Sequence, residues 1–494
     1  MEGGTGRGGG WYVRGERAEG EARVADIVVS GAGLVGLSAA LLLAADGHRL
    51  TVVERDPAPA PDPSEAWGDW ERRGVNQFRL PHYLQPRFRA VVESELPAVA
   101  DALAAAGARR FDLLAAIPDF VTGGPRDGDE DLIALTARRP VAEAAVASVA
   151  ESTDGITVRR GAAVRALRTG TPTSPGVPHV TGVALEEGGQ IEADLVVDAT
   201  GRRSPLPGWV ESAGGRPPVE EGDDSGFVYF GRHFRSDDGE LPPVLGGLAQ
   251  SYGSISALTL PADNGTWSVV LVASSHDAAM RGLRDPDRWT RTVRTLPLCA
   301  HWLEGEPLGD KVEVMAKIED RRRSLVVDGG PVATGVVAVG DAWACTNPSL
   351  GRGATIGLLH ALALRDLVRQ GPLDDPRGLA AAWATATDES VGGWYEDTND
   401  YDRHRLGEIQ AEIAGVPYEP GDPSWETTKA MEWAVTRDPD VLRSFLRVAG
   451  VHQRRDDALA GPGVADAVSA ARASWRDEPR VGPSREELLA TVAG

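Results

Sequence analysis

The clearest pattern of apolar and polar positions lies over residues 25–57. A short apolar run, DIVVS, leads into Gly31, Gly33 and Gly36; an Ala- and Leu-rich segment follows, and then the run RLTVVE, which ends at Glu54. This order predicts a strand, a tight turn, a helix and a parallel strand. The first glycine permits the turn, the second lets a pyrophosphate approach the backbone, and the third allows close helix packing. We therefore expect a dinucleotide at the helix N-terminus, with Glu54 accepting from its ribose hydroxyls.

A second turn of the same shape lies much later, in GDAWACTNPSLGRG at residues 340–353. It ends the apolar run GVVAVGD and opens another Ala- and Leu-rich segment, so it again predicts a strand, a turn and a helix. Asp341 at the strand tip would accept hydrogen bonds from ribityl hydroxyls, and Gly351 and Gly353 would let the backbone lie against a flavin ring. The first turn alone suits either FAD or NAD. Together the two turns predict FAD, with one turn at each end.

The rest of the chain divides by its periodicity. Short alternating runs, FVYFGRHFRS, SALTLP and TWSVVLVASS, predict an antiparallel sheet, which we interpret as the floor of a substrate pocket. After residue 372 the apolar and aromatic residues recur at helical spacing, which predicts a C-terminal helical region. Residues 1–23 have the composition of a disordered leader.

Composition excludes several classes of partner. The formal net charge of −22 and the pI near 4.9 argue against binding to nucleic acid or to an anionic membrane surface. No apolar run reaches the roughly 18 residues that a membrane-spanning helix needs. The two cysteines, Cys299 and Cys345, are too few for a disulfide framework, and the nine histidines lack metal-ligand spacing. These features predict a cytoplasmic protein with reduced thiols and no metal site.

Three further stretches accompany the two turns: RRGVNQFRLPHYL at 72–84, ALTARRPVAEAAV at 134–146 and ADLVVDATGRRSPLPGWV at 193–210. With them, the chain resembles the p-hydroxybenzoate hydroxylase and squalene epoxidase superfamily of FAD-dependent monooxygenases. Its motifs are most similar to those of bacterial polyether-type flavin epoxidases.

The resemblance implies an α/β fold, in which a Rossmann-like FAD-binding domain of the glutathione-reductase type is interleaved with an antiparallel β-sheet substrate domain. We expect FAD-binding segments at residues 24–95, 135–210 and 325–372. The substrate domain would take residues 96–134 and 211–324, and the helical region residues 373–494.

The resemblance also implies site residues. Arg139 occupies the position that approaches the flavin in this family, and Arg55 and Val164 join the expected cofactor-binding set. Pocket candidates near the flavin are Gln77, Arg79, His82 and Pro348. For His82 the alternative is a purely structural hydrogen-bonding role.

The chemistry that the resemblance implies belongs mainly to the cofactor. Reduced FAD captures O2 as a C4a-hydroperoxide and passes one oxygen to a small apolar organic substrate, by hydroxylation or epoxidation, in secondary metabolism. No side chain is therefore assigned a certain catalytic role. Two alternatives stay open: a flavin reductase of carbon–carbon double bonds, like the geranylgeranyl reductases, and a flavoprotein without turnover. The chain lacks both the YxWxFP motif of those reductases and the WxWxIP signature of flavin halogenases.

The source of electrons is NAD(P)H, used directly or through a separate flavin reductase. In the family, an Asp-Gly-x-x-Ser-x-x-Arg turn helps to engage NADPH. Here Asp198 no longer adjoins the glycine, and Pro207 stands where that arginine would be. Proline offers no charge and no donor, although Arg202 and Arg203 lie nearby as substitutes. We therefore favour the separate reductase.

Overall fold

The computed structural model describes residues 24–72, 74, 75, 77–477 and 481–494; the predicted leader, residues 1–23, lies outside them. At the centre is a parallel sheet with the strand order β21-β10-β1-β2-β6. Its strands are β1 (Asp26–Ser30), β2 (Arg49–Glu54), β6 (Ile156–Arg160), β10 (Leu195–Asp198) and β21 (Val336–Ala338). Both faces are covered, as an all-parallel sheet requires, and the strands β1, β10 and β21 are accordingly buried at almost every position.

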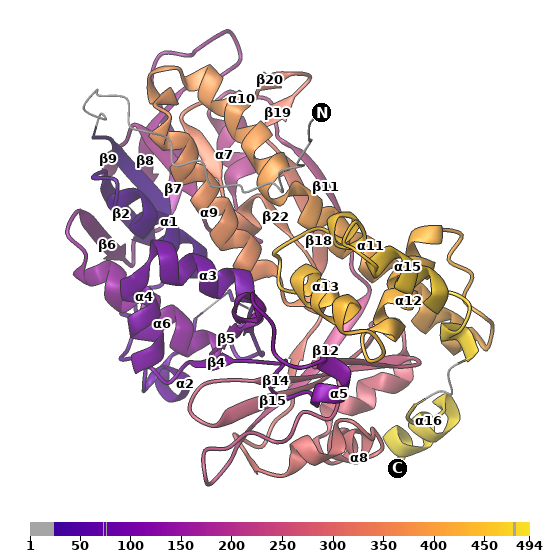
Figure 1. Ribbon diagram of the computed structural model, residues 1–494. Helices are drawn as coiled ribbons and strands as arrows, with labels where there is room; N and C mark the ends of the chain where they lie inside the picture. Colours follow the sequence, from indigo (N-terminus) through magenta and orange to yellow (C-terminus); the bar gives the residue numbers. More distant parts are fainter. Residues whose placement is uncertain (1–23, 73, 76, 478–480) are drawn as a thin grey trace, which may run out of the picture.

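One face of this sheet packs against helices (Figure 1). The helices are α1 (Leu34–Ala44), α3 (Pro86–Glu95), α4 (Pro97–Ala105), α6 (Arg139–Ser152), α9 (Gly353–Arg369) and α10 (Pro376–Thr387). The sequence of α1, LVGLSAALLLA, is apolar around its whole circumference, and α1 is accordingly buried between α6 and α9. The boundaries expected from the sequence assign α4 to the substrate domain, but α4 packs against α6, because Val99 and Leu103 contribute to this core.

The other face is covered by a small antiparallel sheet and a short helix. Strands β7 (Val164–Thr169), β8 (Val180–Leu185) and β9 (Gln190–Glu192) form the sheet, and α7 (Leu206–Ser212) lies beside it. Val28 and Val196 of the central sheet point to this side, while Val29 and Val197 point to the helices. This alternation follows from the two-residue repeat of a strand.

The predicted antiparallel sheet is confirmed. It has the order β13-β14-β15-β12-β16, and β17 also pairs with β12. The strands are β12 (Phe227–Arg235), β13 (Ala249–Tyr252), β14 (Ile255–Pro261), β15 (Thr266–Ser274), β16 (Glu306–Pro307) and β17 (Glu313–Met315). Phe230 and Phe234 pack on one face, against α8 (Pro286–Arg294) and α16 (Arg485–Ala493), whereas Phe227 and Tyr229 pack on the opposite face near Leu80.

Short sheets connect these layers. One is formed by β3 (Tyr83–Leu84), β5 (Ala134–Thr136) and β4 (Arg109–Phe111), and another by β11 (Val219–Asp224), β18 (Glu319–Ser324) and β22 (Ala344–Cys345). A hairpin joins β19 (Val326–Val327) and β20 (Gly330–Pro331). Because β22 leads toward α9, the second sheet links the antiparallel region to the second glycine turn.

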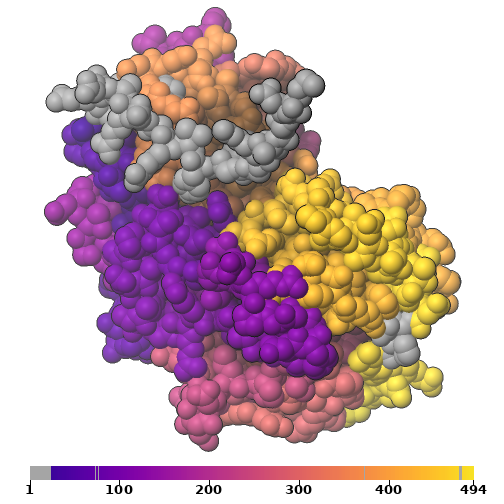
Figure 2. All heavy atoms as spheres, in the orientation of Figure 1, coloured from indigo at the N-terminus to yellow at the C-terminus, as the bar shows by residue number. Residues whose placement is uncertain are grey.

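The predicted C-terminal helical region is also confirmed. It contains α11 (Gly393–Ala414), α12 (Pro423–Ala434), α13 (Pro439–Ala449), α14 (Arg455–Leu459) and α15 (Val464–Ala471). Asp422 and Asp438 cap α12 and α13, each followed by a proline in the first turn. Arg443 of α13 forms an ion pair with Asp129, and Figure 2 shows this region abutting the N-terminal part of the chain. The last helix, α16, differs from the rest, because Leu488 and Val492 join the core of the antiparallel sheet.

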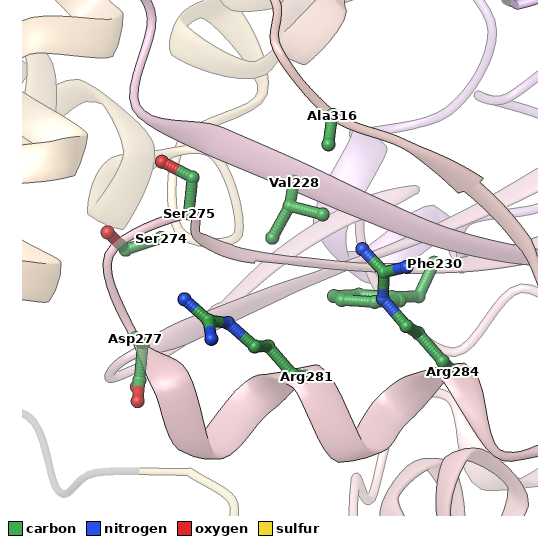
Figure 3. A pocket seen from close by; sticks show the side chains of 8 residues that line it. All are labelled: Val228, Phe230, Ser274, Ser275, Asp277, Arg281, Arg284 and Ala316. Atoms are coloured by element: carbon green, nitrogen blue, oxygen red, sulfur yellow. The ribbon is translucent and has the colours of Figure 1, made fainter.

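A small cavity of about 70 Å³ lies against the antiparallel sheet. Figure 3 shows Arg281 and Arg284 reaching from one short helix toward Val228 and Phe230. No residue of the predicted site lines this cavity. None of the helices in the described part of the chain combines the length and hydrophobicity that a membrane span requires.

Candidate cofactor and substrate site

The three glycines of the first turn have different surroundings. Gly31 has a φ of +106°, and a Cβ there would lie 2.5 Å from the carbonyl oxygen of Ala199; a Cβ at Gly36 would overlap the carbonyl oxygen of Gly31. At Gly33, which precedes α1, a Cβ would meet only the Nη1 of Arg72, at 3.8 Å. Gly31 and Gly36 are therefore required by packing, whereas Gly33 faces open space.

That open space lies at the N-terminus of α1. No side chain of the described residues caps this helix, and its first turn contains no acidic residue. The first N–H groups of an uncapped helix and the helix dipole favour an anion. The turn therefore fits a pyrophosphate; that a side chain at Gly33 would block a pyrophosphate stays a prediction.

Glu54, at the end of β2, has room for one further hydrogen bond. Its carboxylate accepts from the backbone N–H groups of Ala32 (2.9 Å) and Asp56 (3.0 Å) and from the guanidinium group of Arg72. A carboxylate offers about four acceptor positions, so about one remains for a ribose hydroxyl. Glu54 thus fits its expected role, which stays a prediction.

Arg55 and Val164 lie close to Glu54. A Cβ at Gly74 would overlap the guanidinium group of Arg55, which places that loop over the end of β2. Val164 begins β7, and the N–H of Ala162, two residues earlier, donates to the carbonyl of Glu54 at 2.9 Å. The fold brings the three residues together near the C-terminal end of β2. Their contact with a cofactor stays a prediction.

A buried network of charged groups runs from Glu54 toward the other turn. Arg72 pairs with Glu54 and, at 2.7 Å, with Glu143 of α6. Arg139 pairs with the same Glu143 at 2.7 Å, one helical turn away, and contacts the Nε2 of His82 at 3.0 Å. Glu143 is 0% exposed. Burial opposes its ionisation, but the two arginines outweigh burial and hold its pKa below the usual value.

His82 is a neutral member of this network. Its Nδ1 donates to the carbonyl of Leu80 at 3.0 Å, so its Nε2 accepts from Arg139. Burial, together with the positive charge of Arg139, lowers the pKa of His82 to about 3. In this structure His82 therefore orients Arg139, the residue that the sequence resemblance places near the flavin.

The second turn is also open. Asp341, in a short 3-10 helix at Gly340–Ala342, is half-buried, and its carboxylate makes no hydrogen bond to another described residue. Burial raises its pKa, while the positive charges of Arg139 and Arg202 oppose that shift. An acceptor held in this way suits the hydroxyl groups of a ribityl chain.

The segment after Asp341 presents its backbone to open space. Gly351 has a φ of +62°, Pro348 is exposed, and a Cβ at Gly353 would meet no atom within 4 Å. No side chain caps α9, so its N–H groups are available to the electron-rich edge of a flavin. The side-chain amide of Gln85 holds this segment by donating to the carbonyl of Leu350 at 3.1 Å.

The two turns meet through Val35 of α1. A Cβ at Gly340 would lie 3.1 Å from a methyl group of Val35, and a Cβ at Gly357 of α9 would overlap the other methyl group. The starts of α1 and α9 therefore lie against one another. One long ligand can reach both turns.

Of the remaining pocket candidates, Gln77 and Arg79 are less closely connected to the turns. The guanidinium group of Arg79 donates to the backbone carbonyls of Trp67 and Trp70 and lies 4.8 Å from the Trp67 ring centroid. Arg79 also lines an open groove of about 430 Å³ together with Trp67 and Glu313. Gln77 is half-buried in the same loop, where its backbone carbonyl accepts from the backbone N–H of Leu80. Their roles stay predictions.

The mid-chain turn is closed on itself. Asp198 is 0% exposed, and its carboxylate accepts from the N–H and hydroxyl of Thr200 and from the hydroxyl of Ser204. Pro207 lies in the first turn of α7. Asp198 therefore stabilises its own loop and has no acceptor directed outward.

Sequence reasoning missed Arg72 and Glu143. Glu143 lies four residues after Arg139 in a predicted helix, so their pairing could have been predicted from the spacing. Arg72 lies in a loop, and its two partners come from β2 and α6. No local signal identifies such a residue.

Comparison with known proteins supports the fold. No protein-family model matches the chain. Protein Rv3254 of Mycobacterium tuberculosis (strain ATCC 25618 / H37Rv) is 28% identical over 364 residues, 68% of this chain and 72% of that protein. Among solved structures, the flavin-dependent brominase Bmp2 aligns with a TM-score of 0.60 at 16% identity, over 92% of this chain and 100% of its own. PqsL, a probable FAD-dependent monooxygenase from Pseudomonas aeruginosa, aligns with a TM-score of 0.55 at 17% identity, over 78% and 99%.

The chain has the fold of these flavoproteins. A third structure, OxyS anhydrotetracycline hydroxylase from Streptomyces rimosus, aligns with a TM-score of 0.53 at 17% identity, over 87% of this chain and 76% of its own. The expected mixed α/β fold with a C-terminal helical region is therefore confirmed at the level of architecture.

Proposed function

We propose that the protein is an FAD-dependent monooxygenase that inserts one oxygen atom from O2 into an apolar organic substrate. The observation that carries this proposal is the pair of open turns at Gly33 and Gly353, brought together on Val35 beside the carboxylate of Asp341, which has no hydrogen-bond partner among the described residues. A ligand that carries both a pyrophosphate and a polyhydroxyl chain, as FAD does, can use both turns. The resemblance to polyether-type epoxidases favours epoxidation, and the hydroxylase OxyS among the structural neighbours keeps hydroxylation as the alternative.

When bound, FAD supplies the oxygen-activating chemistry. The residues of the chain bind and orient it: the N-terminus of α1 would hold the pyrophosphate, Glu54 a ribose hydroxyl and Asp341 the ribityl chain. The apolar face of the antiparallel sheet that carries Phe227 and Tyr229 would exclude water from the substrate.

We also propose that a separate flavin reductase supplies the electrons from NAD(P)H. The support is the closed mid-chain turn, in which Asp198 is satisfied internally and Pro207 begins a helix. This leaves no outward acceptor at Asp198 and no arginine at position 207 for a nicotinamide dinucleotide.

The cofactor is tested by purifying the protein and identifying the compound that denaturation releases. FAD is the expected product, and a colourless protein that binds NAD but rejects FAD contradicts the assignment. The holoprotein is then reduced without air and mixed with O2 in the absence of substrate. Rapid reoxidation with release of hydrogen peroxide supports an oxygenase, whereas a reduced flavin that persists in air for hours favours the double-bond reductase.

A further inference from the structure

Three side chains with buried polar atoms that lack an aligned hydrogen-bond partner among the described residues meet behind the loop that carries Pro348. Asp402 of α11 is 3% exposed, and neither of its carboxyl oxygens has a partner among the described residues. The Nδ2 of Asn347 and the Oγ of Ser349 are likewise buried and unpartnered within the described chain. The side chains of Ser349 and Asn347 act on Asp402 as hydrogen-bond donors that lower its pKa, but these contacts fall outside the distance or angle of a full hydrogen bond, so none of the three groups is fully satisfied among the described residues. Such groups are costly when unsatisfied, so their convergence points to a ligand group that completes them.

The position of Asn347 is fixed by its neighbours. Its Oδ1 accepts from the hydroxyl of Tyr229 at 2.8 Å, and its backbone N–H donates to the carboxylate of Asp320. Tyr229 lies on the face of the antiparallel sheet that is turned toward Leu80 and the α11 residue Leu406. The cluster therefore lies where the second turn, the sheet and the C-terminal region meet, and the Nδ2 of Asn347 lacks an aligned partner among the described residues.

The charge of the cluster selects the kind of ligand. Burial raises the pKa of Asp402 to about 8. The side chains of Ser349 and Asn347 and the positive charge of Arg352 oppose this shift, and the negative charge of Asp320 adds to it. Asp402 is then protonated at neutral pH and offers one O–H donor. With the Asn347 amide and the Ser349 hydroxyl, the cluster presents mainly donors, and Asp320 disfavours an anion. A neutral carbonyl oxygen matches this set.

We propose that Asp402, Asn347 and Ser349 form a subsite that binds a carbonyl oxygen of the organic substrate and orients it beside the loop of Pro348. This rests on the proposed function, since it places the substrate next to the expected flavin. It also gives α11, and with it the C-terminal helical region, a part in substrate selection.

Calorimetric titration tests the subsite with three pairs of neutral compounds: 1-tetralone and tetralin, 9-fluorenone and fluorene, anthrone and 9,10-dihydroanthracene. We expect at least one ketone to bind the wild-type holoprotein about tenfold more tightly than its hydrocarbon partner. Asp402→Leu should remove about tenfold of the affinity for that ketone and leave the affinity for the hydrocarbon unchanged. Asp402→Asn, which keeps a donor, should retain affinity within about threefold.

The control is Asp400→Asn, on an exposed position of the same helix, which should bind every compound as the wild type does. Ser349→Ala provides a second removal of a donor if Asp402→Leu does not fold. The proposal is overturned if no ketone is preferred, or if the preference persists in both Asp402→Leu and Ser349→Ala. Because heat is measured rather than flavin colour, a protein without FAD but with the ketone preference refutes the proposed function and not the subsite.

Discussion

Alanine substitutions at Gly33 and Gly36 distinguish a glycine that a ligand requires from a glycine that the fold requires. A Cβ at Gly33 would have only the Nη1 of Arg72 within 4 Å, and its φ of −85° is ordinary for alanine. We expect the free energy of unfolding of the FAD-free protein to change by about 0.5 kcal/mol or less. At Gly36 the Cβ would overlap the Gly31 carbonyl oxygen and lie 3.1 Å from the Cβ of Ala199. Gly36→Ala should therefore lower the free energy of unfolding by about 1–3 kcal/mol or more.

Gly33→Ala, which should leave the stability of the FAD-free protein nearly unchanged, should instead weaken FAD binding. The methyl group of Gly33→Ala would occupy the position of a pyrophosphate oxygen and remove at least one charge-assisted hydrogen bond, about 1.5–3 kcal/mol. That corresponds to a Kd for FAD raised about 10- to 150-fold. Gly208→Ala is the matched control: it lies in α7, a Cβ there would meet no atom within 4 Å, and it should leave the Kd unchanged.

Both quantities are measured on protein from which FAD has been removed. Titration with FAD, followed by quenching of its fluorescence, gives the Kd, and urea unfolding followed by circular dichroism gives the free energy of unfolding. Wild-type affinity in Gly33→Ala would refute the role given to the first turn. So would a loss of stability in Gly33→Ala as large as that in Gly36→Ala.

Three further outcomes are expected. Asp341→Ala should weaken FAD binding about 10-fold or more without lowering the Tm of the FAD-free protein, because the carboxylate has no hydrogen-bond partner among the described residues to lose; a lowered Tm contradicts this. Burial lowers the pKa of His360 to about 3, and those of His82 and His233 also to about 3, so the unfolded chain binds protons that the folded chain cannot. Stability should fall as the pH drops below 6.5, by about 2 kcal/mol per histidine at pH 5, and His360→Asn should show a flatter dependence in urea unfolding at pH 7 and 5. Finally, NADPH or NADH alone should bleach the bound flavin slowly in anaerobic stopped flow; rapid bleaching contradicts the need for a separate reductase.

Much of the architecture was predictable because local patterns determine it. The order of apolar runs and glycines in residues 25–57 specifies β1, α1 and β2, and the alternation after residue 226 specifies the antiparallel sheet. Helix caps such as Asp438 before Pro439 identify starts in the C-terminal region. These features depend on neighbours within a few residues, so the sequence alone is sufficient to find them.

The remainder of the site depends on contacts between distant segments. Asp402 is an acidic residue in a helix of mixed composition, and nothing in its neighbourhood along the chain indicates that it is buried beside Asn347. Arg72 likewise acquires its partners only when β2 and α6 are placed on either side of its loop. Tertiary packing determines the burial of these groups, and burial determines their protonation and their chemistry.

The charged network explains why the backbone of the first turn should dominate cofactor affinity. Glu54, Arg72, Glu143 and Arg139 alternate in sign, and the neutral His82 ends the chain of contacts. Two negative and two positive groups leave no net charge, which reduces the penalty of burying them. The arginines are thereby committed to carboxylates and provide no surplus positive charge for a diphosphate. The uncapped N-terminus of α1 must then stabilise the phosphates, so a single methyl group placed there should weaken binding more than the loss of any one charge from the network.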